Sequence, residues 1–244
     1  MLEARELRLS ISGKTILDGV SARFQAGEIS VVTGPNGSGK SRFMHSLAGL
    51  ETPDSGEVLL DSQPYPGRDQ RLGTGVGLVF QQPELQVIEQ TVEQDILFGL
   101  RNIGLDPDRR QEILEESILW SGLESHRHQD PGTLSGGELR RLALASVLAM
   151  GPRYILLDEP FENLDYPGVA ETLHQIIKIR DRGCGVIIVT HGLEKCLAHA
   201  DRLLLMKSGR IIADALPERV LPFLEDHDVR RPGMKIRDMS WLRS

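Results

Sequence analysis

Two spacings of apolar residues alternate along the chain and divide it into predicted strands and predicted helices. Apolar residues at every second position, or in short β-branched runs, predict strands, whereas spacings of three and four predict helices. Strands are expected at residues 6–12, 19–24, 29–33, 57–60, 77–80, 154–157, 186–190, 203–206 and 210–213. Helices are expected at residues 41–50, 93–100, 111–120, 139–150 and 169–179.

The order of these elements predicts an α/β fold with one insertion. The first two strands are separated by short turns, which is typical of an antiparallel pair. Later strands alternate with helices, and this pattern predicts a mainly parallel sheet. Helical patterns dominate between residues 82 and 150, so we expect a helical lobe inserted into the core. The strands at 203–206 and 210–213 flank a Lys-Ser-Gly turn and predict a closing hairpin, and apolar residues at 216–224 predict a short amphipathic helix.

Composition and charge narrow the class of protein. The 244 residues suffice for one large domain or two closely joined lobes. A net charge of −7 argues against general nucleic-acid binding, which normally requires a basic face. It leaves nucleotide binding open, because backbone N–H groups can hold phosphates on an acidic protein. The sequence contains neither a long apolar run nor the apolar core of a signal peptide, so a soluble chain is expected. Cys184 and Cys196 match no metal-ligand spacing and are expected to be reduced thiols.

The segment GPNGSGKS matches the phosphate-binding pattern G-x-x-x-x-G-K-[ST] in full. It follows a predicted strand and precedes a predicted helix, as the pattern requires. Its glycines let the backbone wrap closely, so that N–H groups and the helix N-terminus face phosphate oxygens. Lys40 supplies a positive charge, and the Ser41 hydroxyl is a natural Mg²⁺ ligand. The predicted nucleotide-binding residues are Gly34, Pro35, Asn36, Gly37, Ser38, Gly39, Lys40, Ser41 and Arg42.

Three polar residues follow other predicted core strands. An acid at the C-terminal end of a core strand in such a protein is placed to hold the metal, which assigns Asp158 to Mg²⁺. Glu159 is expected to point differently, because side chains alternate on an extended chain. It would then act as general base on the attacking water, a role worth about 10²–10⁴ in rate. The alternative is a pair of solvated turn acids. His191 also ends a strand, at the edge where parallel sheets gather ligands, and is predicted to contact the γ-phosphate or the water.

The segment LSGGELRR at residues 134–141 allows two interpretations. Ser135 and Glu138 have the spacing of a capping box at a helix start. A capping box does not require Gly136 and Gly137, which remove side chains from where a phosphate could approach. Because a helix start is itself an anion site, the two interpretations are compatible.

With these motifs in this order, the chain resembles the ATP-binding subunits of ABC transporters over about residues 1–215. GPNGSGKS is similar to the family's Walker A loop, and YILLDEP to its Walker B motif, with Glu159 as catalytic glutamate. LSGGELRR is similar to the signature, normally LSGGQ. Gln81 in VFQQP matches the Q-loop glutamine, a hinge between the lobes and a contact to Mg²⁺ or water. Asp165 matches the D-loop residue that crosses to the opposing subunit, and His191 in THGLE matches the switch histidine.

The resemblance implies a P-loop NTPase core with a mixed, mainly parallel sheet, an N-terminal antiparallel β part and the inserted helical lobe at about residues 82–150. Residues 1–215 would form this ABC ATPase domain, and residues 216–244 a helical extension. That extension has two interpretations: a dimer contact, or a segment packed on its own domain.

Two positions depart from the family pattern. Ile11 stands where the family usually places an aromatic residue that stacks on adenine, which puts that stacking in doubt. Glu138 replaces the usual glutamine of the signature. Either residue completes a capping box, and an acid in the first turn suits the helix dipole by about 0.3–1 kcal/mol.

The implied function is that of an ATP-hydrolysing motor subunit using ATP and Mg²⁺. Two chains, identical or homologous, would sandwich two ATP molecules, with Ser135, Gly136, Gly137, Glu138 and Asp165 acting on the partner's nucleotide. The stretch from residue 79 to 105 is similar to energy-coupling-factor ATPases, which power the uptake of vitamins or of cobalt and nickel ions. The expected partners are therefore integral membrane subunits and a second ATPase, without nucleic acid. The expected location is peripheral, at the cytoplasmic face of the membrane.

Other functions compatible with a P-loop remain as alternatives. They include another class of ABC importer or exporter, and a non-transport ABC ATPase of DNA repair or ribosomes. ABC ATPases of DNA repair usually carry a long coiled coil between the lobes, and ribosomal ones usually carry two cassettes per chain. This sequence has neither feature. A small-molecule kinase would have no use for LSGGE.

Overall fold

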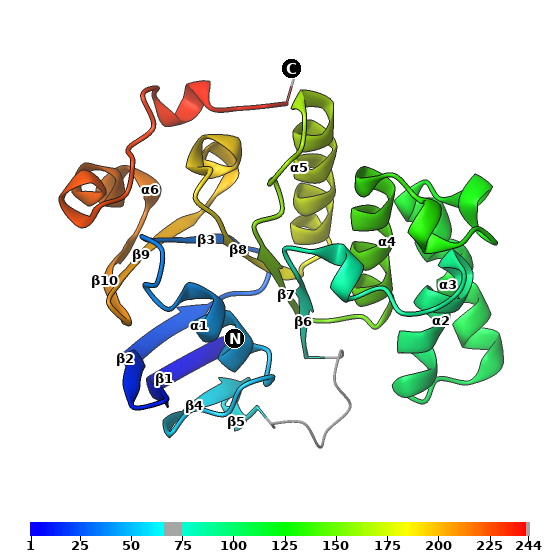
Figure 1. The fold of residues 1–244 in the computed structure, drawn as a ribbon, viewed down its shortest axis with the longest axis horizontal. Coiled ribbons are helices and arrows are strands. Elements are labelled where there is room, and N and C mark those ends of the chain that lie inside the picture. The colour runs from blue at the N-terminus through cyan, green and yellow to red at the C-terminus, as the bar shows by residue number, and fades with distance from the viewer. Residues whose placement is uncertain (66–74, 243–244) are drawn as a thin grey trace.

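The computed structural model describes residues 1–65 and 75–242, and its centre is a six-stranded sheet (Figure 1). The strand order is β10-β9-β3-β8-β7-β6. Neighbouring strands are parallel except for the hairpin of β9 and β10. The mainly parallel sheet and the closing hairpin are therefore confirmed. The strands are β3 (Ile29–Thr33), β6 (Val76–Val79), β7 (Tyr154–Asp158), β8 (Gly185–Val189), β9 (Arg202–Lys207) and β10 (Arg210–Ala215).

A second sheet contains the N-terminal strands and is antiparallel, as expected. Its order is β2-β1-β4-β5. The register pairs Leu2 with Phe24 at one end and Ile11 with Lys14 at the other. The strands are β1 (Leu2–Ile11), β2 (Lys14–Phe24), β4 (Ser55–Leu60) and β5 (Gln63–Pro64).

The central sheet is buried on both faces over β3, β7, β8 and β9, because these strands contribute side chains alternately to two cores. Val31 of β3 belongs to one core and the adjacent Val32 to the other. Helix α1 (Lys40–Leu47) and the antiparallel sheet cover one face. Helix α5 (Tyr166–Asp181) and the C-terminal segment cover the opposite face. The short apolar runs in the sequence are explained by this two-sided burial.

The helical lobe lies beside the β6 edge of the sheet (Figure 1). It contains α2 (Val92–Asn102), α3 (Pro107–Ser121) and α4 (Gly136–Ala149). The N-cap residues Thr91, Asp106 and Ser135 each accept a backbone N–H of the helix that they precede. Helix α4 is shared by both lobes, because Leu142 packs in the lobe's own core whereas Leu144 packs in the main core.

The C-terminal segment differs from the single helix expected at residues 216–224. Helix α6 contains only Pro217–Val220, and Leu221–Phe223 and Glu225–His227 form separate 3-10 turns. Pro222 has no N–H to donate, so one regular α-helix cannot run through this stretch without losing a bond. Leu224 and Met239 are buried in the main core, and the segment thus packs on its own domain.

Short 3-10 turns complete the structure at Pro83–Leu85, Glu124–His126, Pro131–Thr133, Leu193–Lys195, Leu197–His199 and Ile236–Asp238. Within residues 1–65 and 75–242, no helix has both the length and the apolar character needed to cross a bilayer.

Candidate nucleotide-binding and hydrolysis site

Three neighbouring strands carry the predicted site residues to one edge of the central sheet. Strand β3 leads into the GPNGSGKS loop, β7 ends at Asp158, and β8 lies between them and ends just before Thr190. A single cleft at this edge is lined by the following sequence-predicted residues: Asn36, Gly37, Ser38, Gly39, Lys40, Ser41, Arg42, Gln81, Asp158, Glu159 and His191. The structure therefore brings together residues that are more than 150 positions apart in the chain.

The glycine loop has the shape of a phosphate cradle. A Cβ on Gly34 would lie 2.0 Å from the carbonyl oxygen of Met206, and one on Gly39 would lie 2.8 Å from that of Ile16. Both glycines also have positive φ, 153° and 100°, which L-residues with side chains rarely adopt. Helix α1 begins at Lys40, within the GPNGSGKS segment, and its N-cap residue Gly39 has no side chain to cap the first turn. Its free N–H groups can receive phosphate oxygens, so the loop fits the phosphates of ATP.

Lys40 is folded into this loop. Its Nζ donates to the carbonyl oxygens of Gly34 at 2.8 Å and Pro35 at 3.0 Å. Burial lowers the pKa of Lys40, while the nearby charges of Glu159 and Asp158 oppose that shift. The ammonium group is thus a desolvated donor at the cleft, where its attraction to phosphate is stronger than in water.

Asp158 and Ser41 form an oxygen-rich corner of the cleft. Burial raises the pKa of Asp158, and a hydrogen bond from the Ser41 hydroxyl is one of the contacts that act to lower it. A carboxylate and a hydroxyl are suitable ligands for Mg²⁺, which takes its remaining ligands from phosphate and water. Among the described residues no cluster of three or more His, Cys, Asp or Glu could hold a metal alone. The donor set fits a Mg²⁺ ion that arrives with the nucleotide.

Glu159 reaches the cleft by a different route from the one expected. The residue does not continue the pleat of β7, since its φ is +44° and the chain turns there. The alternation argument for its direction was therefore wrong, although the side chain does line the cleft. Its Oε2 accepts the Thr190 hydroxyl at 2.9 Å, and its Oε1 accepts the His191 backbone N–H at 3.0 Å.

The environment of Glu159 suits proton transfer. Burial is the main cause that raises its pKa, and the charges of Asp158 and Glu162 act in the same direction. The imidazole Nε2 of His191 lies 3.7 Å from Glu159 Oε1. Burial lowers the pKa of His191, which favours the neutral imidazole. A carboxylate of raised basicity beside a histidine can accept a proton from a water in this cleft.

Several cleft residues were not predicted from the sequence. The most notable is Glu162, whose Oε2 accepts Gln81 Nε2 at 2.5 Å. Lys195 is another, and its Nζ donates to the Phe161 carbonyl at 3.0 Å. The sequence offered one indication of Glu162 as a cleft residue, because it is an acidic residue between two motif residues, Glu159 and Asp165. The other unpredicted residues are Lys14, Ile16, Phe161, Asn163, Val189, Thr190 and Gly192.

Ile11 lies at the end of β1 and is not among the described residues that line the cleft. Lys14 and Ile16, on the adjacent strand β2, line it instead. The aliphatic side chain of Ile16 and the amine of Lys14 can contact a base without aromatic stacking.

The signature residues lie outside this cleft as the structure describes it, and so does Asp165. The capping box is present as predicted, with Glu138 Oε2 accepting the Ser135 backbone N–H at 2.8 Å and Ser135 Oγ accepting the Glu138 N–H at 3.4 Å. Apart from the adjacent residues and the backbone of α4 itself, no heavy atom of the described residues lies within 4 Å of a Cβ built on Gly136 or Gly137. Asp165 Oδ1 caps α5 through the Gly168 N–H at 2.9 Å. Both helix starts are therefore accessible from outside the chain.

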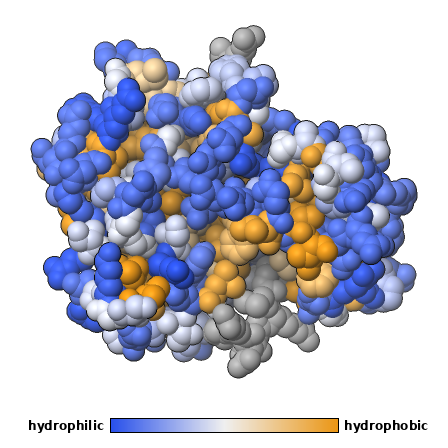
Figure 2. All heavy atoms as spheres, in the orientation of Figure 1, coloured by the Kyte–Doolittle hydropathy of each residue, from blue (hydrophilic) through white to orange (hydrophobic). Residues whose placement is uncertain are grey.

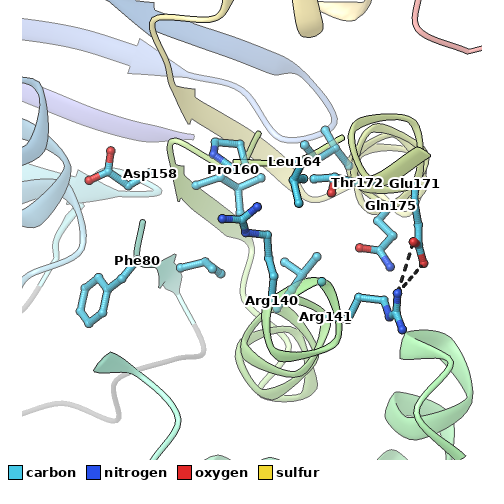
Figure 3. Close-up of a pocket in the computed structure, with 15 residues that line it drawn as sticks. Phe80, Arg140, Arg141, Asp158, Pro160, Leu164, Glu171, Thr172 and Gln175 are labelled. Atoms are coloured by element: carbon cyan, nitrogen blue, oxygen red, sulfur yellow. Dashed lines mark hydrogen bonds and ion pairs between the residues drawn. The ribbon is translucent and has the colours of Figure 1, made fainter. Parts of the chain in front are cut away.

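A second pocket lies between α4 and α5, and Figure 3 shows the residues that line it. Arg141 of α4 pairs with Glu171 of α5 at 3.1 Å. Arg140 extends from α4 toward Pro160, and its Nη1 donates to the Glu162 carbonyl at 3.1 Å. Two arginines of the signature segment thus connect the helical lobe to the core beside the cleft.

Comparison with known proteins agrees with this geometry. Residues 17–162 match the ABC transporter family model. The chain belongs to the family of ABC transporter ATPases. ABC ATPases bind ATP with Mg²⁺ and hydrolyse it, so this chain is an ATPase.

The relatives of this ABC ATPase include subunits of energy-coupling-factor systems. It is 40% identical over 225 residues to the cobalt import ATP-binding protein CbiO of Syntrophus aciditrophicus, covering 91% of this chain and 80% of that protein. It is 35% identical to the energy-coupling factor transporter ATP-binding protein EcfA2 of Clostridium perfringens, covering 94% and 82%. The solved structure of cbiO1 from Clostridium perfringens, part of the ABC transporter complex cbiONQ, matches with a TM-score of 0.81 and 31% identity, covering 94% of each chain.

Proposed function

We propose that this ABC ATPase is the motor subunit of an energy-coupling-factor type importer that takes up a metal ion or a vitamin. Two chains, identical or homologous, close on two ATP molecules and reopen after hydrolysis, and this cycle moves an integral membrane partner. The ATPase lies peripherally at the cytoplasmic face of that membrane. The observation that supports the proposal most is the clamped Glu159 carboxylate, in a chain whose relatives are named for cobalt import and energy coupling.

Each cis residue has a role that follows from its position. The loop N–H groups and Lys40 hold the β- and γ-phosphates. Asp158, Ser41 and Gln81 would hold Mg²⁺, which would offset the negative charge of the phosphates. Glu159 orients the attacking water and takes its proton, and His191 contacts the γ-phosphate from the end of β8.

The trans residues are proposed to act on the nucleotide of the second chain. The start of α4 offers N–H groups beside two glycines without side chains, and no described side chain fills the space above them. A γ-phosphate brought by a partner would find an anion site there. The Ser135 hydroxyl adds a donor, and Glu138 keeps the capping box that fixes the geometry. Asp165, the N-cap of α5, is proposed to contact the second chain as well.

A partner surface is supported by exposed apolar residues on the helical lobe. Leu85 is 70% exposed, Ile88 62% and Phe98 39%, in α2 and the segment that leads to it. Figure 2 shows apolar side chains gathered on this face between the two lobes. Exposed apolar surface of this kind marks interaction sites in soluble proteins. A helix of the membrane subunit is the proposed occupant.

The test is recovery of the membrane partner in mild detergent from the native membrane, followed by mass spectrometry. The wild-type chain should recover an integral transporter subunit, and Ile88→Glu should lose it. The matched control is Leu119→Glu, because Leu119 is also 70% exposed on the same lobe but lies on α3. If no integral membrane protein is recovered with the wild type, the transporter assignment is wrong, and a non-transport ABC ATPase takes its place.

A further inference from the structure

Glu162 is a third carboxylate of the nucleotide cleft, beside Asp158 and Glu159. It belongs to none of the motifs that identify the family in this sequence. Its Oε2 lies 2.5 Å from Nε2 of Gln81, which follows β6 at the junction between core and helical lobe. The contact joins two segments that are 81 positions apart.

The chemistry of this contact determines which way the Gln81 amide faces. A carboxylate has acceptors only, so the amide must turn its NH₂ group to Glu162. The amide oxygen Oε1 then lies on the other branch of the planar group. Of the two ends, only this oxygen can ligate a hard cation such as Mg²⁺. Without an acceptor at Glu162, either end could face the cleft.

The carboxylate is held in place by its own loop. Arg140 of α4 donates to the Glu162 carbonyl at 3.1 Å, and the Glu162 N–H donates to the Glu159 carbonyl at 3.1 Å. The preceding Phe161 is 1% exposed, and Lys195 binds its carbonyl. A backbone fixed on both sides can set the position of a side chain that is itself exposed.

We propose that Glu162 is a positioning residue that orients the Gln81 amide so that Oε1 faces the metal of the bound Mg²⁺–nucleotide. Such outer contacts fix the orientation of a metal ligand, and their loss typically costs about 10–100-fold in metal affinity or activity. The inference rests on the proposed role of Gln81 as a metal contact and adds to it the group that sets its orientation.

The experiment measures binding of a fluorescent ATP analogue, once in EDTA and once across a Mg²⁺ titration. Glu162→Ala should raise the Mg²⁺ concentration for half-maximal binding on the order of tenfold. Binding in EDTA should not change, because the phosphate loop is intact. The melting temperature should not change either, since both side chains of the pair are exposed at the surface.

Two further variants separate orientation from other effects. Glu162→Gln keeps an acceptor oxygen for Gln81 Nε2 but adds a donor, so the Gln81 amide can pair in either orientation and the Mg²⁺ dependence should lie between those of the wild type and Glu162→Ala. Glu171→Ala removes another glutamate that joins the core to α4, through Arg141, without touching Gln81. It should leave the Mg²⁺ dependence unchanged.

The inference is overturned if Glu162→Gln matches Glu162→Ala, because the charge would then matter and not the hydrogen bond. It is equally overturned if Glu162→Gln matches the wild type, because a group that only accepts would then not be needed to orient Gln81. It is also overturned if Glu171→Ala gives the same shift, which would indicate general loosening between the lobes. Gln81→Ala distinguishes the remaining cases. If it raises the Mg²⁺ requirement while Glu162→Ala does not, only the positioning role fails. If neither variant does, the metal contact of Gln81 itself is wrong.

Discussion

The Thr190 hydroxyl donates to Oε2 of Glu159 over 2.9 Å, from the end of the strand adjacent to the one that carries the glutamate. Thr190 is 1% exposed, so its hydroxyl has few competing partners. The next residue, His191, donates its backbone N–H to the other carboxylate oxygen at 3.0 Å. Two donors from one strand end thus hold the carboxylate in a single orientation. Preorganisation of this kind places a general base before the substrate arrives.

The first prediction concerns that base. Glu159→Gln should lower the rate of phosphate release by about 10²–10⁴, because an amide cannot take the proton of the attacking water. ATP binding should persist, since the phosphate loop is unchanged, and ATP should trap a dimer on a sizing column. Glu171→Gln, outside the cleft, is the control and should hydrolyse normally. A Glu159→Gln enzyme with full activity would refute the general-base assignment.

The second prediction separates the two interpretations of Ser135. Ser135→Ala removes the N-cap of α4, and Thr91→Ala removes the corresponding cap of α2 in the same lobe. Each should cost about 0.5–2 kcal/mol of unfolding free energy. Only Ser135→Ala should also lower ATP hydrolysis at saturating ATP, because of the two hydroxyls only that of Ser135 is proposed to contact the partner's nucleotide. Urea unfolding and phosphate release measure the two effects. Equal loss of activity in both variants would reduce Ser135 to a helix cap.

Most elements of the core could be predicted because burial on both faces leaves a strong pattern. The run at 29–33 forms β3 with the same bounds, and all five of its residues are buried. Element ends were less predictable, as in α3, which begins at Pro107 and not near residue 111. The C-terminal helix could not be predicted correctly, because its apolar residues pack on the core from separate short turns and not from one helical face.

The site was predictable where a motif binds phosphate through backbone shape, and less so where it depends on local turns. The direction of Glu159 depends on a residue with positive φ, which a pattern of strands does not indicate. The contact between Gln81 and Glu162 depends on two loops that meet only after the lobes pack. Residue type alone therefore predicted neither the direction of the Glu159 side chain nor the contact between Gln81 and Glu162.

The third prediction concerns acid stability and Glu3 of β1. This carboxylate is 4% exposed and lies 2.7 Å from both Arg5 and Arg23. Hydrogen bonds from Arg5 and Arg23 lower the pKa of Glu3 to about 2. Because the folded pKa lies below the unfolded one, the pairing stabilises the fold above about pH 4.5 and is lost as pH falls toward 2.

Glu3→Gln should therefore be less stable than the wild type at pH 7, and the difference should narrow as pH falls below about 4.5. Urea unfolding followed by circular dichroism across this range measures it. Glu57→Gln on β4 is the control, since Glu57 is exposed and has a longer contact of 3.3 Å to Arg5. A difference between Glu3→Gln and wild type that does not vary with pH would contradict the pairing.

The fourth prediction concerns the C-terminal segment, which Trp241 anchors to the start of α5 and to the turn at Leu193–Lys195. Its ring stacks on Tyr166, the first residue of α5, with centroids 5.3 Å apart, and its indole N–H donates to the Glu194 carbonyl at 2.9 Å. Trp241→Ala should lower the unfolding free energy by about 0.5–1.5 kcal/mol through the lost aromatic pair. Release of the segment should also speed tryptic cleavage at Lys235. Met234→Ala serves as control, because Met234 is 53% exposed on the same segment and should change neither property. If Trp241→Ala left both stability and cleavage unchanged, the segment would not be held by this residue, and packing of Met239 would have to account for its position.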